Sequence, residues 1–208
     1  MRVVLASHNA KKLKELQELL TGVDVQLVTQ SSLGIAEAAE PHATFLENAL
    51  AKARHAARAA QCAALADDSG LCVAALGGAP GVISAHWSGE VTPLGDREAT
   101  RAVQDAQNNA KLLQAMVGQT QRQARFVSTL VAVRSADDPE PLVAVGRWEG
   151  EILTQPHGEG GFGYDPLMFI PALGKTVAQL SAAQKNAHSH RALAAAQLVR
   201  LLREAWAV

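Results

Sequence analysis

The sequence carries two adjacent carboxylates in Asp67-Asp68-Ser69-Gly70, directly after the short apolar run at residues 63–66. Neighbouring carboxylates repel each other, and successive side chains of a strand point to opposite faces, so we expect one of the two to enter a ligand site. A metal ion would stabilise that carboxylate. The alternative is a polar turn in which Asp67 or Asp68 accepts hydrogen bonds from backbone N–H groups.

A second segment, Ser7-His8-Asn9-Ala10-Lys11-Lys12, lies where an apolar run passes into a helical pattern. A helix N-terminus has unpaired N–H groups and partial positive charge, which makes two lysines unfavourable there unless an anion is present. A bound phosphate would resolve the conflict, with the backbone N–H groups around it and a lysine as counter-charge. Alternatively, Asn9 caps the helix and both lysines are solvated.

Two later segments could contact an organic ligand. Glycines flank Phe162 and Tyr164 in the segment that ends at Asp165, and would let the backbone approach a ligand while the rings offer faces for stacking. The alternative is a loop that turns a corner without binding anything. Lys185, His190 and Arg191 gather at the start of the last helical pattern, where the lysine and arginine can only donate hydrogen bonds. A solvated helix start is the alternative there.

The elements that must position these residues follow from the apolar periodicity. We expect strands at residues 2–6, 25–28, 63–66, 71–76, 126–133 and 142–148, the last two forming a hairpin. Helices are expected at 11–20, 44–61, 99–118 and 189–206, the second opening on the capping-box pattern of Thr44 and Glu47. Early alternation of strand and helix followed by a hairpin predicts an α/β fold: a mixed sheet with helices on both faces.

Composition limits the function. The 208 residues are 48% hydrophobic, enough for one domain over 1–208, and the formal net charge of -1 gives no basic excess for nucleic-acid binding. The start of the chain lacks the long apolar region of a signal peptide, and no apolar run is long enough to span a membrane. We therefore expect a cytoplasmic protein that binds neither nucleic acid nor membrane.

Taken together, six motifs resemble the inosine/xanthosine triphosphate pyrophosphatase family in their order and spacing. They are Ser7-x-Asn9-x-x-Lys12-x-x-Glu15, Thr44-Phe45-x-Glu47-Asn48-Ala49-x-x-Lys52-Ala53, Asp67-Asp68-Ser69-Gly70-Leu71, Gly77-Gly78-Ala79-Pro80-Gly81, Gly161-Phe162-Gly163-Tyr164-Asp165-Pro166 and Ser189-His190-Arg191. The similarity spans nearly the whole chain.

The resemblance implies Mg²⁺-dependent hydrolysis of ITP, dITP and XTP to the monophosphate and pyrophosphate, by a homodimer whose subunit has a long central sheet and two lobes around a nucleotide cleft. Asp68 matches the catalytic carboxylate and metal ligand, and Glu40 lies where a second metal ligand is expected. By the same matching, the remaining site residues bind substrate: Ser7, His8, Asn9, Ala10, Lys11, Lys12, Lys52 and Ser69 at the phosphates, Phe162, Gly163, Tyr164 and Asp165 around base and sugar, and Lys185, His190 and Arg191 at the base.

Two other functions stay open. The phosphate and metal parts of such a site do not depend on the base, so the substrate could be another modified nucleotide or a pyrimidine nucleotide. The chain could also be a non-catalytic sensor that binds a nucleotide without cleaving it.

Overall fold

A computed structural model describes residues 1–8 and 10–208, with the backbone alone at residues 10 and 11. The described residues form a seven-stranded sheet in the order β2-β1-β3-β4-β5-β6-β7. The strands are β1 (Arg2–Leu5), β2 (Gln26–Thr29), β3 (Ala63–Val73), β4 (Gln123–Val133), β5 (Leu142–Ile152), β6 (Met168–Ile170) and β7 (Lys175–Thr176). The α-helices are α1 (Ala10–Leu19), α2 (Phe45–Ala60), α3 (Arg97–Ala115), α4 (Ala182–His188) and α5 (His190–Trp206).

The sheet is mixed, as the sequence predicts. Strand β1 is parallel to both β2 and β3, whereas β6 is antiparallel to β5 and to β7. The chain divides into two compact units, and strands β3, β4 and β5 have residues in both. That division agrees with the expectation of two lobes; the nucleotide cleft, and the single domain over 1–208, stay predictions.

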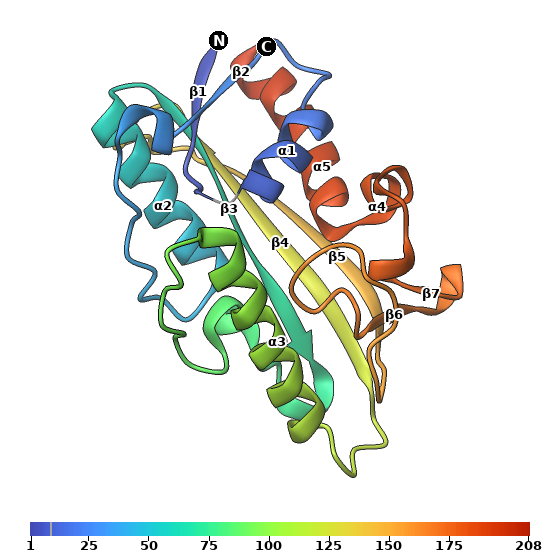
Figure 1. The fold of residues 1–208 in the computed structure, drawn as a ribbon. Helices are drawn as coiled ribbons and strands as arrows, with labels where there is room; N and C mark the ends of the chain where they lie inside the picture. The colour runs from blue at the N-terminus through green and yellow to red at the C-terminus, as the bar shows by residue number, and fades with distance from the viewer. Residues whose placement is uncertain (9) are drawn as a thin grey trace. The chain divides into compact units, whose positions relative to one another are not determined.

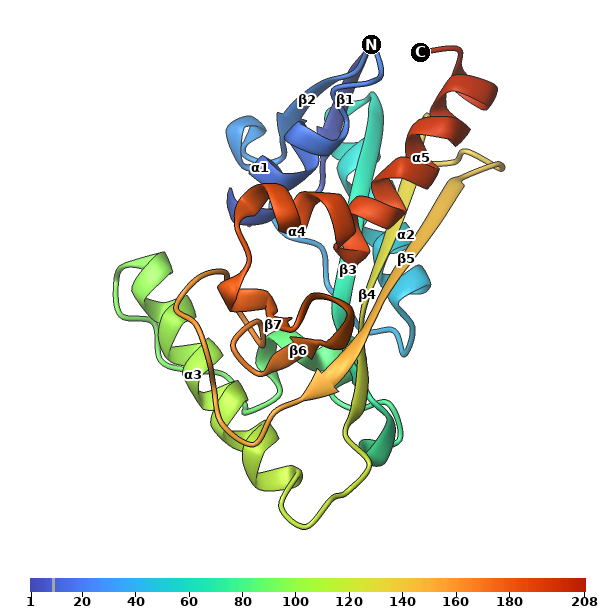
Figure 2. The ribbon, with the colours of Figure 1, turned by 90° about the vertical axis from the view of Figure 1, so that its right-hand side faces the viewer.

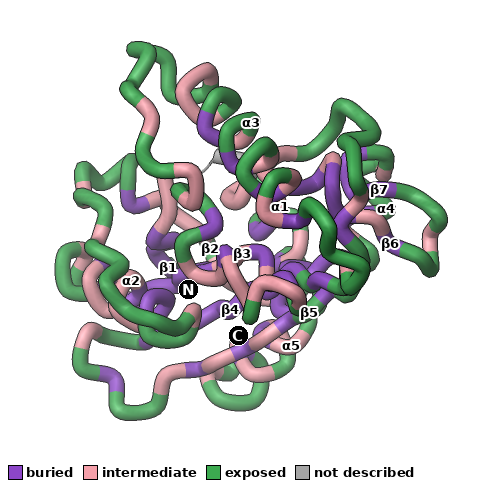
Figure 3. The backbone as a smooth tube through the Cα atoms, turned by 90° about the horizontal axis from the view of Figure 1, so that it is seen from below, coloured by how far each residue is buried: buried purple, intermediate pink, exposed green. Residues whose placement is uncertain are grey.

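The first unit comprises Met1–Ser69, Ser128–Arg147 and His188–Val208. Its strands alternate between two apolar clusters: Val3 and Leu5 pack with residues of α1 and α5, while Val4 and Ala6 pack with the alanines of α2. Helices therefore cover both faces of this part of the sheet, with α2 on one side and α1 and α5 on the other (Figure 1). The strands between them are mostly buried (Figure 3).

The second unit comprises Gly70–Val127 and Trp148–Ala187. Its core joins the end of β3, the start of β4 and the end of β5 to helix α3, and Tyr164 and Leu167 from the glycine-rich segment complete it. Residues 153–167, all of them described, contain no helix or strand, and backbone hydrogen bonds from Leu153 to Leu167 and from His157 to Pro166 join the two ends of this loop.

Local signals predict the helix starts well. Thr44 accepts a hydrogen bond from the N–H of Glu47 at the start of α2, and Ser189 accepts one from Ala192 at the start of α5. Two expectations were wrong. Residues 63–66 and 71–76 do not form separate strands, because β3 continues through Asp67-Asp68-Ser69-Gly70 and ends at Val73. Lys185 does not precede a single final helix but lies inside the separate helix α4.

Candidate functional site

The acidic pair lies within β3 in the first unit, and the pleat of the strand separates its two carboxylates. Ala63 and Leu65 face the cluster that contains α1 and α5, whereas Ala64 and Ala66 face the cluster that contains α2. Continuing this alternation directs Asp67 to the α1 and α5 face and Asp68 to the α2 face. The strand continues through both acids because each carboxylate finds a cation on its own face.

Asp67 is the anchor of a buried ionic network. Its carboxylate lies 2.9 Å from Lys12 Nζ and 3.4 Å from a guanidinium nitrogen of Arg191, and it accepts a hydrogen bond of 2.7 Å from Ser128 Oγ. Burial by itself would raise the pKa of Asp67, but the charges of Lys12 and Arg191 outweigh it and hold the pKa far below its ordinary value. Asp67 is therefore ionised throughout the physiological range and is committed to holding cations.

Asp68 has a different environment. Its Oδ1 lies 2.8 Å from Lys52 Nζ of α2, and that ammonium also lies 2.8 Å from Oε2 of Glu40. Burial raises the pKa of Asp68 to about 6, although the charges of Lys52 and Lys12 oppose that rise. The second carboxylate, Glu40, raises the pKa of Asp68 further because two like charges share one small region. Asp68 can thus gain and lose a proton near neutral pH.

The residues around Asp68 suit a divalent cation. Oδ2 of Asp68 is buried, and no hydrogen-bond partner within the described part of the chain reaches it. Glu40 and Asp68 already share one cation, the ammonium of Lys52. Among the residues described, no cluster of three or more His, Cys, Asp or Glu could enclose a metal. Mg²⁺ uses one or two carboxylates and completes its shell with water and phosphate oxygens, so this sparse donor set fits it.

The other residues predicted for the first unit are placed as follows. Ser69 Oγ donates to Asp67 at 3.2 Å and accepts from Arg191 at 3.2 Å, so it joins the Asp67 network. Arg191, which is 1% exposed, also pairs with Glu15. His190 is buried at the start of α5, and Ser7 is half-buried after β1. Asn9, and the side chains of Ala10 and Lys11, lie outside the described residues.

His8 lies beside the segment that leads to Glu40. Its Nε2 lies 3.2 Å from the carbonyl oxygen of Ile35, and its Nδ1 lies 2.9 Å from Glu37. His55 of α2 contacts the next carbonyl, that of Ala36, at 3.0 Å. Two histidines therefore fasten the start of the segment that ends at Glu40, a contact that the sequence did not reveal.

The second unit contains Lys185 together with the residues predicted to surround base and sugar. Lys185 Nζ lies 3.0 Å from Oδ2 of Asp165 and 4.4 Å from the centre of the Phe162 ring, so an ammonium, a carboxylate and an aromatic face are adjacent. Tyr164 does not offer its ring for stacking: it is 5% exposed, packs in the core, and donates its hydroxyl to the carbonyl of Ser84. His190 and Arg191 belong to the first unit, so the structure does not group them with Lys185 in one unit.

Sequence reasoning did not assign roles to three members of the Asp67 network. The sequence does not distinguish whether Asp67 enters a ligand site or caps a turn, and it shows Glu15 only as one position of a motif. Ser128 gave no signal at all, because a lone serine in an apolar strand has no distinctive spacing. Its role depends on the neighbour that the sheet brings beside it.

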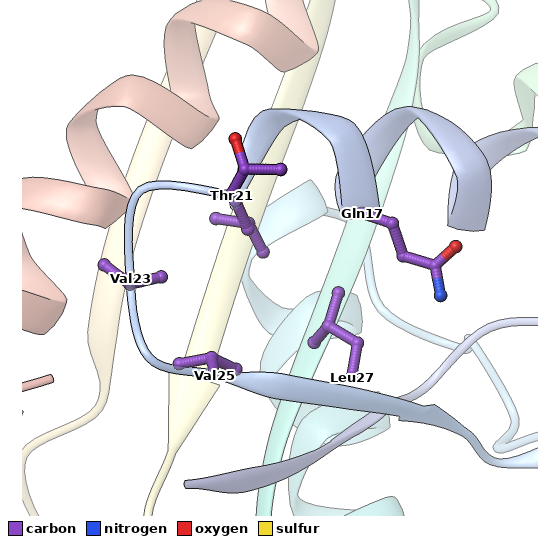
Figure 4. Close-up of a pocket in the computed structure, with 6 residues that line it drawn as sticks. Gln17, Thr21, Val23, Val25 and Leu27 are labelled. Atoms are coloured by element: carbon purple, nitrogen blue, oxygen red, sulfur yellow. The ribbon is translucent and has the colours of Figure 1, made fainter.

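A pocket of about 300 Å³ lies at the end of α1 in the first unit (Figure 4). It is lined by Gln17, Leu20, Thr21, Val23, Val25 and Leu27. None of these lining side chains carries a charge, so this pocket has no groups to neutralise a polyphosphate. The charged cluster on β3 remains the candidate functional site.

The fold and the site define an α/β protein with a buried cluster of paired carboxylates and cations on β3. The sequence model of the Ham1 family matches residues 3–201, and the chain belongs to that family. A protein of Methylibium petroleiphilum named dITP/XTP pyrophosphatase is 68% identical over 206 residues, covering 99% of each chain. One of the same name from Ralstonia nicotianae is 55% identical over 97% of this chain and 96% of that protein.

Solved structures agree. A HAM1 protein from Coxiella burnetii superimposes with a TM-score of 0.88 at 40% identity, covering 99% of this chain and 100% of the other. A structure from Mycobacterium abscessus described as a nucleoside-triphosphatase or dITP/XTP pyrophosphatase has a TM-score of 0.71 at 38% identity, covering 98% of this chain and 97% of that one. These matches confirm the family membership that the six motifs predict. No helix among the described residues is long and apolar enough to cross a membrane.

Proposed function

We propose that the protein is a Mg²⁺-dependent pyrophosphatase that hydrolyses non-standard purine nucleoside triphosphates, namely ITP, dITP and XTP, to the monophosphate and pyrophosphate. The observation that carries the proposal is the buried Asp68 oxygen without a hydrogen-bond partner among the described residues, beside Lys52 and Glu40. Relatives of 68% and 55% identity that bear the name dITP/XTP pyrophosphatase support the choice of substrate.

The charged groups of the first unit suit the chemistry of an anhydride. Asp68 and Glu40 would hold Mg²⁺, which when bound neutralises phosphate charge and keeps the phosphate oxygens in place. Lys52 and Lys12 provide further positive charge for a pyrophosphate leaving group. Asp67 keeps Lys12 and Arg191 in position, since each of these cations lies within ion-pair distance of it.

In the proposed reaction a water molecule attacks the α-phosphorus. Asp68 accepts a proton from that water as the new phosphorus–oxygen bond forms, and the bond from the α-phosphorus to the α,β-bridging oxygen breaks. Pyrophosphate leaves with the bonding electrons. Burial raises the pKa of the Asp68 carboxyl group, which makes its ionised form a better proton acceptor than an exposed carboxylate.

The second unit supplies groups suited to a 6-keto purine. Phe162 offers an aromatic face, and Lys185 beside it can only donate hydrogen bonds. A 6-keto oxygen accepts from such a donor, whereas the 6-amino group of adenine presents another donor and leaves the ammonium poorly matched. This difference favours hypoxanthine and xanthine over adenine.

The test is pyrophosphate release from ITP, XTP, dITP, ATP, GTP and dUTP, with Mg²⁺ and with a chelator. We expect release from the first three in Mg²⁺ and loss of activity in the chelator. Preferred cleavage of dUTP would contradict the assignment to purines. Tight binding of ITP without any pyrophosphate released would instead identify a nucleotide sensor.

A further inference from the structure

The glycine-rich loop of the second unit is fastened to α3 by two side chains that act on one residue. Asp105 Oδ2 accepts a hydrogen bond of 2.7 Å from the N–H of Gly163, and Asn109 Nδ2 donates one of 2.8 Å to the carbonyl of the same glycine. Asp105 and Asn109 are four residues apart and so share one face of the helix. In Figure 2 the loop, drawn in orange, passes along α3.

Gly163 lies between Phe162 and Asp165, the residues that carry the predicted recognition groups. The N–H of Phe162 donates to Asp165 Oδ2 at 3.0 Å, and the N–H of Asp165 donates to the carbonyl of Phe162 at 3.3 Å. Asp165 Oδ2 in turn lies 3.0 Å from Lys185 Nζ, which is placed over the Phe162 ring. These contacts fix the shape of the turn. Its position on the unit is set by the buried Tyr164, by the N–H of Ala178, which donates to the carbonyl of Asp165, and by the two side chains of α3 at Gly163.

Other polar side chains of α3 have a separate structural role. Gln104 donates to Ser88 Oγ at 2.7 Å, and Asn108 donates to the carbonyls of Ser84 and Ala85 at 3.2 and 3.1 Å. These two residues are buried, whereas Asp105 and Asn109 are half-buried. One stripe of α3 therefore packs the interior, and the adjacent stripe holds the loop.

We propose that Asp105 and Asn109 are positioning residues that clamp the Gly163 peptide and thereby hold the Phe162 ring and the Asp165–Lys185 pair in place for base recognition. The inference rests on the proposed function, since it concerns how the proposed pyrophosphatase recognises the base of its substrate. Neither residue needs to touch the nucleotide. Both act through the backbone of Gly163.

The experiment compares Asp105→Ala/Asn109→Ala with the unaltered enzyme and with Gln107→Ala, which changes an exposed polar residue of the same helix. Each lost hydrogen bond should raise KM for ITP about fivefold, so the double variant should show a rise of more than about tenfold. We expect kcat to change by less than about threefold, because Asp68 and its cations are untouched. Asp105→Asn keeps an acceptor oxygen for the Gly163 N–H and should restore most of the lost affinity.

Inhibition by inorganic tripolyphosphate separates positioning of the base from general damage, because that ion has no base. Its inhibition constant should stay within about twofold of the unaltered value in every variant. If the double variant does not fold, Asp105→Ala alone allows the same comparison of ITP with tripolyphosphate. Its KM for ITP should then rise about fivefold.

Two results would overturn the inference: a KM for ITP in the double variant equal to that of Gln107→Ala, or an equal loss of affinity for ITP and for tripolyphosphate. Failure of the proposed function is recognised separately, since the unaltered protein would then release no pyrophosphate from any of these nucleotides.

Discussion

Replacing Asp68 with Asn should stabilise the protein while removing its activity. The pKa of Asp68 is raised by burial from an ordinary value of 3.8 to about 6, so the folded state holds the ionised carboxylate less favourably than water does. The difference corresponds to about 3 kcal/mol of folding free energy. Asn has nearly the shape of a protonated carboxyl group and carries no charge, so it should recover most of that amount, and Lys52 keeps Glu40 as its partner.

The sign of the effect depends on pH in a defined way. Above about pH 6 the carboxylate is ionised in the folded and unfolded states, so the cost is fully present and Asp68→Asn gains about 3 kcal/mol. Between about pH 6 and pH 4 the folded protein takes up a proton at Asp68 before the unfolded chain does, and the gain shrinks. Below about pH 4 both states are protonated and the gain disappears.

The assay is urea unfolding followed by tryptophan fluorescence, at about pH 8 and at about pH 4, with a chelator present so that no metal stabilises the carboxylate. The control is Asp137→Asn, because the Asp137 side chain is 93% exposed and its replacement should change stability by less than about 0.5 kcal/mol. Turnover of ITP should fall about 100-fold or more in Asp68→Asn. A variant that is less stable at pH 8, or equally stabilised at both pH values, would refute the reasoning.

Further outcomes are expected at three residues, Asp67, Tyr164 and Gly161. Asp67→Asn should lower the free energy of unfolding by about 3–5 kcal/mol, because it removes the buried anion that Lys12 and Arg191 share; unchanged urea unfolding at neutral pH would contradict this. The contribution of Asp67, whose pKa is depressed, should be lost as pH falls below its ordinary value. Burial and, secondarily, the charge of a neighbouring aspartate raise the pKa of Tyr164, the one tyrosine of the sequence, so its phenolate absorbance should appear only as the protein unfolds at high pH. Gly161→Ala would place a methyl group against Asp165 Oδ2 at a φ of +75° and should raise KM for ITP about tenfold or more, whereas Gly174→Ala, at a φ of +62° but with open space, should not.

The sequence predicts the elements that local signals define. The helix starts at Thr44 and Ser189 and the apolar strands lie close to their expected positions, because capping residues and periodicity act over a few neighbours. The continuity of β3 through Asp67 and Asp68 could not be predicted this way. Acidic residues are unfavourable in strands, and here cations from distant helices reverse that preference.

The candidate site also contains residues that the sequence identifies and residues that only the folded chain reveals. Asp68, Lys52 and Glu40 follow from motif resemblance, and the structure brings the three together. Ser128, Asp105 and Asn109 carry no local signature, since their importance comes from which backbone or carboxylate the folded chain places opposite them. The burial of Tyr164 could not be predicted from the sequence either. An aromatic residue flanked by glycines has the same sequence pattern whether its ring faces a ligand or packs in the core.

The placement of Asp67 and Asp68 on opposite faces of one strand has an evolutionary consequence. The residue that anchors the buried ionic network and the residue proposed to react are different, although they are neighbours in the chain. A single substitution at Asp68 could therefore yield a stable descendant that still binds a nucleotide but no longer cleaves it. Selection could retain such a descendant for binding alone, whereas a lineage that lost Asp67 would first have to rebuild its interior.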